Sequence, residues 1–354
     1  MTPNLTNSSN GRTIPPEQVQ TLNYCAHAID ALHDLERNWQ HVAPESAQVC
    51  RSLIDKLHQS VKFILPNGCQ LIDPQEFRQT HLDQIRLPFP CVAFEAPWET
   101  EHPVQQPGEF TQWRATKRIA LCWEAGPDHE LLPGHNRILT TFPEGGVFVV
   151  PIYWSPEVQH WTVAFGGAFV PYHNTVITRT LEEATPSSRL AAEALITAGR
   201  ATPTSMQFQA EPFVLLPEGY AEILEKHDGN REEVFAQIML DSHDEIMMLI
   251  QACSVINCAN VSMADIGAPA ALNKKRREKG KQPFFSYKVL QLSDERRESR
   301  TGDGGSSHAS PRMHLRRGHL RRLDSKVVWV RPSMVNPGSR TGVVWKDYAL
   351  PPKE

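Results

Sequence analysis

The segment 310–323, with the sequence SPRMHLRRGHLRRL, concentrates residue types that can act on a phosphodiester. It holds five arginines and two histidines within fourteen residues. Histidines titrate near neutral pH, so they can serve as general base and general acid, and arginines stabilise the charge that develops on a phosphorane. His314 and His319 are therefore candidate catalytic residues of a metal-independent ribonuclease. The same residues also suit simple phosphate binding, which requires no catalysis.

Metal binding by this segment is disfavoured by the spacing of its histidines. His314 and His319 are five positions apart, which places them on different faces of either a helix or a strand. The segment contains no carboxylate or thiolate that would complete a tetrahedral site. We therefore expect no metal ion and no cofactor.

A second basic run at 274–281 makes contact with RNA or other phosphates the most economical interpretation of this region. The aromatic residues near these runs either stack on bases or form the core of strands; they are Phe284, Phe285, Tyr287, Trp329 and Trp345. The residues that we expect to contact nucleic acid are Lys274, Lys275, Arg276, Arg277, Arg312, His314, Arg316, Arg317, His319, Arg321 and Arg322.

Charge is divided unevenly along the chain, although the net charge is only −4. Residues 271–354 contain 20 Lys or Arg and 8 Asp or Glu, whereas residues 1–270 contain 16 and 32. An acidic body joined to a basic end favours contact with a polyanion through that end. The alternative is that the arginines pair with carboxylates of the body.

The composition is that of an ordinary globular protein, with 40% apolar and 21% charged residues. No apolar run approaches the roughly 20 residues that a membrane helix needs, and the first residues do not resemble a signal peptide. The 7 cysteines are scattered, without a CxxC pair or a finger spacing. We therefore expect reduced thiols, no membrane contact and a location in the cytoplasm of a bacterial host.

The pattern of apolar residues predicts an α+β fold that begins with a polar, disordered tail at 1–14. A three- to four-residue period follows Pro15 and returns after Pro44, which predicts a helical hairpin over 15–62. Over 63–215, short runs of branched and aromatic residues separated by Pro and Gly predict a β-rich domain. We expect a mainly antiparallel sheet in this domain, together with one short helix at 186–199.

The remaining sequence divides into a helical block and a basic module. The block spans 216–268, and its longest apolar pattern is interrupted by DSHDE at 241–245, which predicts a break in the helix. Residues 269–354 form the basic C-terminal module, with strands at PFFSYKVLQL, KVVWVRP and VVWKDY. A polar Gly/Ser-rich run near 293–310 predicts a mobile loop within this module.

The last 85 or so residues resemble a type V-A anti-CRISPR family carried by phages and plasmids. The resemblance lies in the ordered segments ALNKKRREKGKQPFFSYKVLQL, PRMHLRRGHLRRL and VVWVRPSMVNPGSRTG. The matching residues are Asn273, Lys274, Lys275, Pro283, Tyr287, Pro311, His314, Arg316, Arg317, Gly318, His319, Pro332, Asn336 and Gly338. Over residues 1–270 the resemblance is one of layout alone.

This resemblance implies an anti-defence regulator that recognises the N-terminal segment of a type V CRISPR nuclease while the nuclease is being made. It also implies loss of the encoding mRNA, with the basic module in contact with mRNA or the ribosome. An acidic body would suit a partner segment that bears Lys or Arg. The ribonuclease described above and a non-catalytic protein-binding scaffold remain the alternatives.

Overall fold

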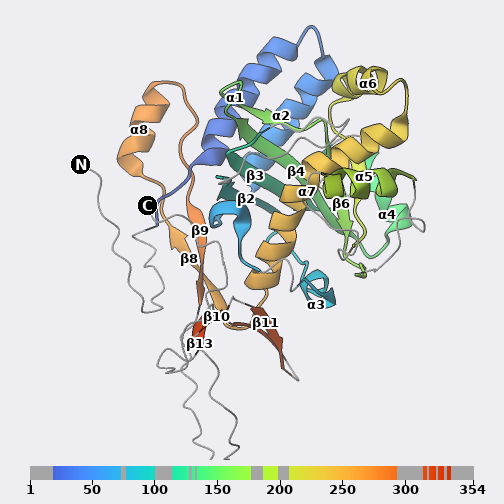
Figure 1. The fold of residues 1–354 in the computed structure, drawn as a ribbon. Coiled ribbons are helices and arrows are strands. Elements are labelled where there is room, and N and C mark those ends of the chain that lie inside the picture. The colour runs from blue at the N-terminus through green and yellow to red at the C-terminus, as the bar shows by residue number, and fades with distance from the viewer. Residues whose placement is uncertain are drawn as a thin grey trace, which may run out of the picture.

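A mixed sheet flanked by helices forms the centre of the molecule in a computed structural model (Figure 1). The structure describes residues 19–72, 77–99, 114–126, 130–131, 134–176, 186–197, 207–292, 314–316, 319–323, 326–330 and 333–335. The predicted tail at 1–14, the predicted loop at 293–310 and the predicted strand VVWKDY lie outside these residues. The expected α+β class is confirmed by the helices and the sheet.

The sheet has nine strands, eight of which follow the order β7-β6-β4-β3-β2-β1-β9-β8, while β5 pairs with β4. Its strands are β1 (Val61–Ile64), β2 (Cys91–Pro97), β3 (Lys117–Glu124), β4 (Gly146–Ser155), β5 (His160–Val163), β6 (Gly166–Pro171), β7 (Glu211–Val214), β8 (Val261–Ile266) and β9 (Tyr287–Leu292). The strands from β2 to β7 pair antiparallel, as expected. β1 is parallel to both neighbours, β2 and β9.

Alternate side chains of the central strands pack into two separate hydrophobic cores, one on each face of the sheet. In β3, Ile119, Leu121 and Trp123 face one core, while Ala120 and Cys122 face the other. All of them are fully buried. A strand covered on both faces carries a continuous apolar run, which is why β2, β3 and β4 were recognisable from sequence.

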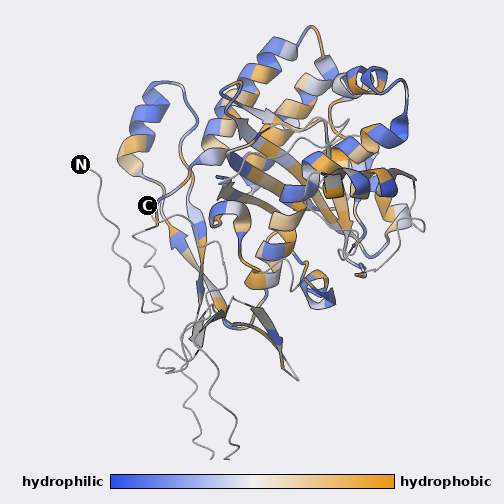
Figure 2. Cartoon of the chain, viewed as in Figure 1, coloured by the Kyte–Doolittle hydropathy of each residue, from blue (hydrophilic) through white to orange (hydrophobic). Residues whose placement is uncertain are grey.

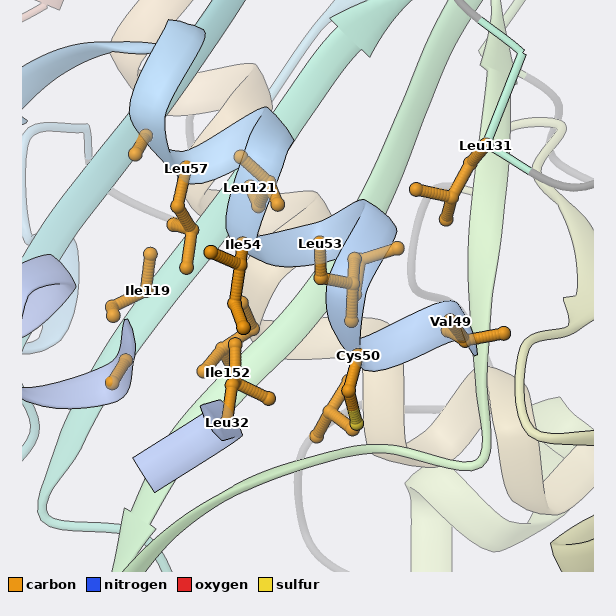
Figure 3. Packing of buried hydrophobic residues seen from close by; sticks show 14 of the residues in the cluster. Leu32, Val49, Cys50, Leu53, Ile54, Leu57, Ile119, Leu121, Leu131 and Ile152 are labelled. Carbon is orange, nitrogen blue, oxygen red and sulfur yellow. The ribbon is translucent and has the colours of Figure 1, made fainter. Parts of the chain in front are cut away.

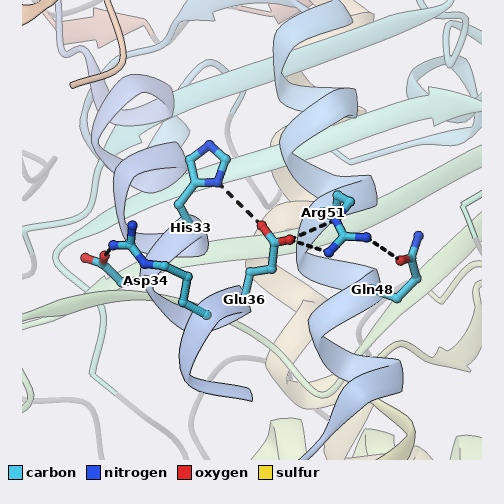
Figure 4. A network of polar contacts seen from close by, with 6 residues as sticks. His33, Asp34, Glu36, Gln48 and Arg51 are labelled. Carbon is cyan, nitrogen blue, oxygen red and sulfur yellow. Dashed lines mark hydrogen bonds and ion pairs between the residues drawn. The ribbon is translucent and has the colours of Figure 1, made fainter. Parts of the chain in front are cut away.

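The first core lies under two antiparallel helices, α1 (Tyr24–Trp39) and α2 (Pro44–Gln59). Leu53, Ile54 and Leu57 of α2 project toward Ile119 and Leu121 of the sheet (Figure 3). On the outer side of the hairpin, a polar network ties the two helices together (Figure 4). The carboxylate of Glu36 in α1 lies 2.6 Å from the guanidinium of Arg51 in α2 and 3.5 Å from the imidazole of His33.

The second core lies under a long helix, α7 (Arg231–Ile256), on the opposite face of the sheet. α7 runs without a break through DSHDE, contrary to the prediction. The remaining helices of four residues or more are α3 (Gln79–Asp83), α4 (Ile138–Thr141), α5 (Pro186–Thr197), α6 (Pro217–Lys226) and α8 (Ala270–Glu278).

At the N-terminus of each helix of the hairpin, the carboxylate of a glutamate distant in sequence accepts hydrogen bonds from the backbone N–H groups. The carboxylate of Glu95 in β2 accepts from the backbone N–H of Tyr24 at 3.0 Å and of Cys25 at 2.8 Å. Glu218 of α6 likewise accepts from the N–H of Glu45 and of Ser46. The predicted start of the first helix after Pro15 is therefore wrong, since the helix begins at Tyr24.

The ranges expected to form separate units meet in this one sheet. Residues 261–266, placed by the sequence in the helical block, form the edge strand β8. β9, from the basic module, pairs with both β8 and β1. The last described strands, β10 (His314–Arg316), β11 (His319–Arg322), β12 (Val327–Val330) and β13 (Ser333–Val335), form two small two-stranded sheets.

Candidate nucleic-acid interface

The first basic run forms α8, a short helix on the side of the molecule (Figure 1). Lys274, Lys275 and Arg277 on this helix are exposed, as are Lys279 and Lys281 in the turn that follows. Hydrophilic residues cover most of α8 (Figure 2). The helix ends at Glu278, and Gly280 reverses the chain with a φ of 64°, a conformation that glycine adopts without strain.

The buried side chain of Asn273 holds α8 to the chain that follows it. Its carboxamide accepts from the N–H of Phe284 at 2.7 Å and donates to the carbonyl of the same residue at 2.9 Å. Asn273 is 7% exposed. Because both bonds join the same two residues, the returning segment is fixed beside the helix, and the lysines project from a defined support.

The structure places Arg276 in contacts within the chain rather than on the basic surface with its neighbours. Its guanidinium lies 2.7 Å from the carboxylate of Asp30 in α1, and its Nε donates to the carbonyl of Gln282 at 2.5 Å. The same group lies over the ring of Phe284, at 4.4 Å from its centre. Arg276 was expected to contact phosphate, and here it joins α8 to the acidic body instead.

A tyrosine and a buried glutamate lock the strand that follows α8. The phenol of Tyr287 in β9 donates to Glu95 at 2.8 Å. Burial raises the pKa of Glu95, and the hydrogen bonds from Cys25, Tyr287 and Tyr24 oppose that rise. β9 is thereby tied to the centre of the sheet and to the first turn of α1.

The aromatic residues of this region are used mainly for packing. Tyr287 is 1% exposed, Phe284 lies under Arg276, and Phe285 packs beside the ammonium of Lys62 at 3.8 Å from the ring centre. The side chain of Trp329 and the whole of Trp345 lie outside the described residues. Of the five aromatics considered for base stacking, the three described ones are assigned to internal contacts.

The second basic run, from Arg312 to Arg322, divides between the two small sheets. His314 is in β10, which pairs with β13, and His319 is in β11, which pairs with β12. Arg321 is exposed. Arg316 and Arg322 lie in the same two strands, whereas Arg312 and Arg317 lie outside the described residues. The candidate acid and base are thus placed in different sheets.

The two basic runs lie at opposite ends of the β8–β9 hairpin (Figure 1). α8 follows the end of β8 at Ile266, whereas β12 meets the chain just before β8 begins, where the N–H of Ala259 donates to the carbonyl of Val327 at 3.0 Å. A six-residue strand spans about 17 Å. The structure therefore separates the two basic runs that the sequence showed.

A buried ion cluster between β3 and α7 was not anticipated from the sequence. Arg118 lies 2.7 Å from the carboxylate of Asp244 and 2.8 Å from that of Glu245, and its guanidinium lies 5.0 Å from the ring centre of Trp98. The side chains of Arg118 and Glu245 are 7% and 0% exposed. The cluster explains why α7 continues through DSHDE, because Arg118 neutralises acidic residues that face the sheet.

Burial raises the pKa of Glu245 to about 7, although the charge of Arg118 opposes the rise. Perturbed carboxylates are common at functional sites and also occur in structural ion clusters. No sequence signal could have found this pair, since residues 118 and 245 are far apart and only the fold brings them together. Within the described residues, no group of three or more His, Cys, Asp or Glu is arranged to hold a metal ion.

All 7 cysteines are buried and free, and burial raises the pKa of thiols such as those of Cys50 and Cys253 to about 12. Thiols of this kind are poor nucleophiles at neutral pH.

None of the described helices is long and apolar enough to cross a membrane. Comparisons with protein-family models, with curated proteins and with solved structures found no match.

Proposed function

We propose that this chain is an anti-CRISPR regulator of a phage or plasmid, and that it lowers the expression of a type V CRISPR nuclease. It recognises an N-terminal segment of the nuclease as that segment is synthesised, and its basic C-terminal residues contact mRNA or ribosomal phosphates. Support for the target comes from the resemblance of residues 271–354 to the type V-A anti-CRISPR family.

The observation that carries the RNA contact is the contrast between Arg276 and its neighbours on α8. Arg276 and Asn273 anchor the helix, which leaves Lys274, Lys275 and Arg277 exposed on a fixed support. A rigid cationic surface binds phosphates at a lower entropic cost than a flexible tail. We assign phosphate contact first to these three residues and to Lys279 and Lys281.

The test of this function is co-expression with a type V nuclease, with the nuclease mRNA and protein measured separately. We expect both to fall with the wild-type chain, and less with the triple variant Lys274→Ala/Lys275→Ala/Arg277→Ala. The matched control, Arg37→Ala/Arg137→Ala/Arg231→Ala, removes the same charge from exposed positions of the body and should act like the wild type. Unchanged nuclease levels with the wild-type chain, for every nuclease homologue tried, would refute the proposal.

RNA binding is measured with the purified protein at several salt concentrations. Removal of one side chain that binds phosphate should reduce the slope of log affinity against log salt by about 0.7 for single-stranded RNA. The triple variant should therefore lower both affinity and slope. If neither changes, these three residues do not contact phosphate. If the wild-type protein binds no RNA at any salt concentration, it acts as a scaffold that holds its target without RNA.

The ribonuclease alternative is tested by incubation of the protein with single-stranded RNA in the presence of a chelator. Cleavage that disappears in His314→Ala/His319→Ala would establish the ribonuclease.

A further inference from the structure

β8 is an outer strand of the nine-stranded sheet, and β9 is its one partner in the described part of the chain. Ser262, Met263 and Asp265 on this strand are exposed. Met263 retains 38% of its surface and the side chain of Asp265 retains 74%. A strand edge that has no partner strand among the described residues offers a template for the backbone of another polypeptide.

The direction of the free backbone groups follows from the register of β8 and β9. The N–H of Val261 donates to the carbonyl of Cys258 at 3.1 Å, so Val261 does not donate to its partner Leu292. Hydrogen-bonded and non-hydrogen-bonded pairs alternate along an antiparallel ladder. The N–H and C=O groups of Met263 and Asp265 therefore point away from β9, toward the open edge.

The chain just before β8 already has a backbone partner. The N–H of Ala259, in the turn that precedes β8, donates to the carbonyl of Val327 in β12 at 3.0 Å. Val327 packs against the cluster of Ile72, Val255 and Cys258, which Val261 also contacts, so β12 lies near the beginning of β8. β12 provides a backbone partner at Ala259, and none of the described segments continues this pairing to Met263 and Asp265.

We infer that the outer edge of β8 receives an extended segment of another polypeptide, which adds to the sheet as a further strand. This inference deepens the proposed function, because a nascent N-terminal segment is unfolded and its backbone groups are unpaired. The receiving strand pair is already ordered, since Tyr287, the first residue of β9, donates a hydrogen bond to Glu95. Pre-ordering of the receiving strand lowers the cost of binding.

The side chains of β8 indicate what the added segment should contain. Met263 and Asp265 are two positions apart and lie on the same face. Asp265 pairs with Lys288 at 2.8 Å, yet the side chain of Asp265 is far more exposed than that of Lys288, which has 22% of its surface free. A segment with an apolar residue opposite Met263 and a Lys or Arg opposite Asp265 would complement this face.

The test uses overlapping synthetic peptides that span the N-terminal region of a type V nuclease, with binding measured by fluorescence anisotropy. Each binding peptide is then remade with N-methyl groups on one or the other set of alternate residues. Strand addition predicts that one set abolishes binding while the other leaves it within about twofold, because alternate amides face the receiving strand. Equal effects of both sets would overturn the inference.

Substitutions in β8 itself provide a second test of strand addition. Met263→Pro removes an N–H that β9 does not use, so the fold should survive while peptide affinity falls about tenfold or more. Ala264→Pro removes an N–H directed at β9 and should lower stability. Arg137→Ala, at an exposed position remote in sequence from β8, should leave peptide affinity unchanged. Wild-type affinity in the folded Met263→Pro variant would refute strand addition at β8.

The outcomes also separate this inference from the proposed function. If nuclease mRNA falls on co-expression and no peptide binds, the function stands and the β8 site is rejected. If peptides add to β8 and expression does not change, the site stands and the proposed function is rejected. A dimer in sedimentation that Met263→Pro dissolves would instead show that a second copy of this chain occupies the edge, which overturns the inference.

Discussion

The phenol of Tyr287 donates a hydrogen bond of 2.8 Å to the carboxylate of Glu95, across 192 positions of sequence. The same carboxylate accepts from the first backbone N–H groups of α1. One buried acidic residue in β2 therefore joins the first turn of α1 to β9, the strand that follows α8. This contact makes the basic end part of the central structure up to Leu292.

Replacement of Tyr287 by Phe should lower the free energy of unfolding by about 2 kcal/mol, because the buried carboxylate loses a donor that water cannot replace. Urea unfolding measures this difference. Tyr220→Phe is the control, since Tyr220 is half-buried beside Ile223 and its cluster, and it should change the free energy by less than about 0.5 kcal/mol. Equal effects of the two substitutions would contradict the role assigned to the Tyr287–Glu95 bond.

Glu245 should make stability depend on pH. Its pKa in the folded state is raised from 4.5 to about 7, so the folded chain binds more protons than the unfolded chain between these values. The contribution of this group to stability therefore falls as pH rises through that window. The stability of the wild type relative to Glu245→Gln should decrease by up to about 3 kcal/mol across it.

Urea unfolding of both proteins at a series of pH values checks this expectation. Glu225→Gln removes the same charge from an exposed position on α6 and corrects for the change in net charge. A stability difference between wild type and Glu245→Gln that stays constant or rises with pH would show that Arg118 keeps Glu245 ionised over the whole range.

Arg276 and Lys275 are adjacent basic residues with different expected roles. Arg276→Ala removes the ion pair with Asp30 and the contact with Phe284, so amide hydrogen exchange across α8 should speed up and stability should fall by about 1 kcal/mol. Lys275→Ala should leave exchange unchanged and weaken RNA binding. If the two variants exchange at the same rate, the anchoring role of Arg276 is excluded.

Gly166 should tolerate no larger residue, because β6 passes close to β7 and α7 there. A Cβ atom at Gly166 would lie 2.4 Å from the carbonyl of Phe213 and 2.6 Å from the side chain of Ile238. Gly166→Ala should therefore lower the melting temperature and destabilise by about 2 kcal/mol. Gly267→Ala meets nothing within 4 Å and should leave stability unchanged or slightly raised.

Local patterns predicted most of the central structure. The apolar runs of β2, β3 and β4 and the periodicity of α2 were sufficient, because each of these elements buries residues with a regular spacing. β8 was missed because none of its residues is fully buried and its partly buried residues have no regular spacing. The start of α1 at Tyr24 lies beside Glu95, which no local sequence window contains, whereas α2 begins at Pro44 as the sequence predicted.

The continuity of α7 has the same kind of explanation. DSHDE predicts a break when its charges are considered alone, and the helix persists because Arg118 from β3 pairs with Asp244 and Glu245. The cost of burying these carboxylates is offset by a partner more than a hundred positions away. Such compensation is invisible to propensity and periodicity.

By itself, the sequence determined the α+β class, the central strands and the concentration of positive charge after residue 270. Tertiary structure alone decided which of those charges face solvent, because Arg276 and Lys275 have the same local setting and only Arg276 meets Asp30. It also decided that the two basic runs stand at opposite ends of one hairpin. A charge becomes a binding surface or a structural contact according to the residues that the fold brings to it, and those residues are distant in sequence.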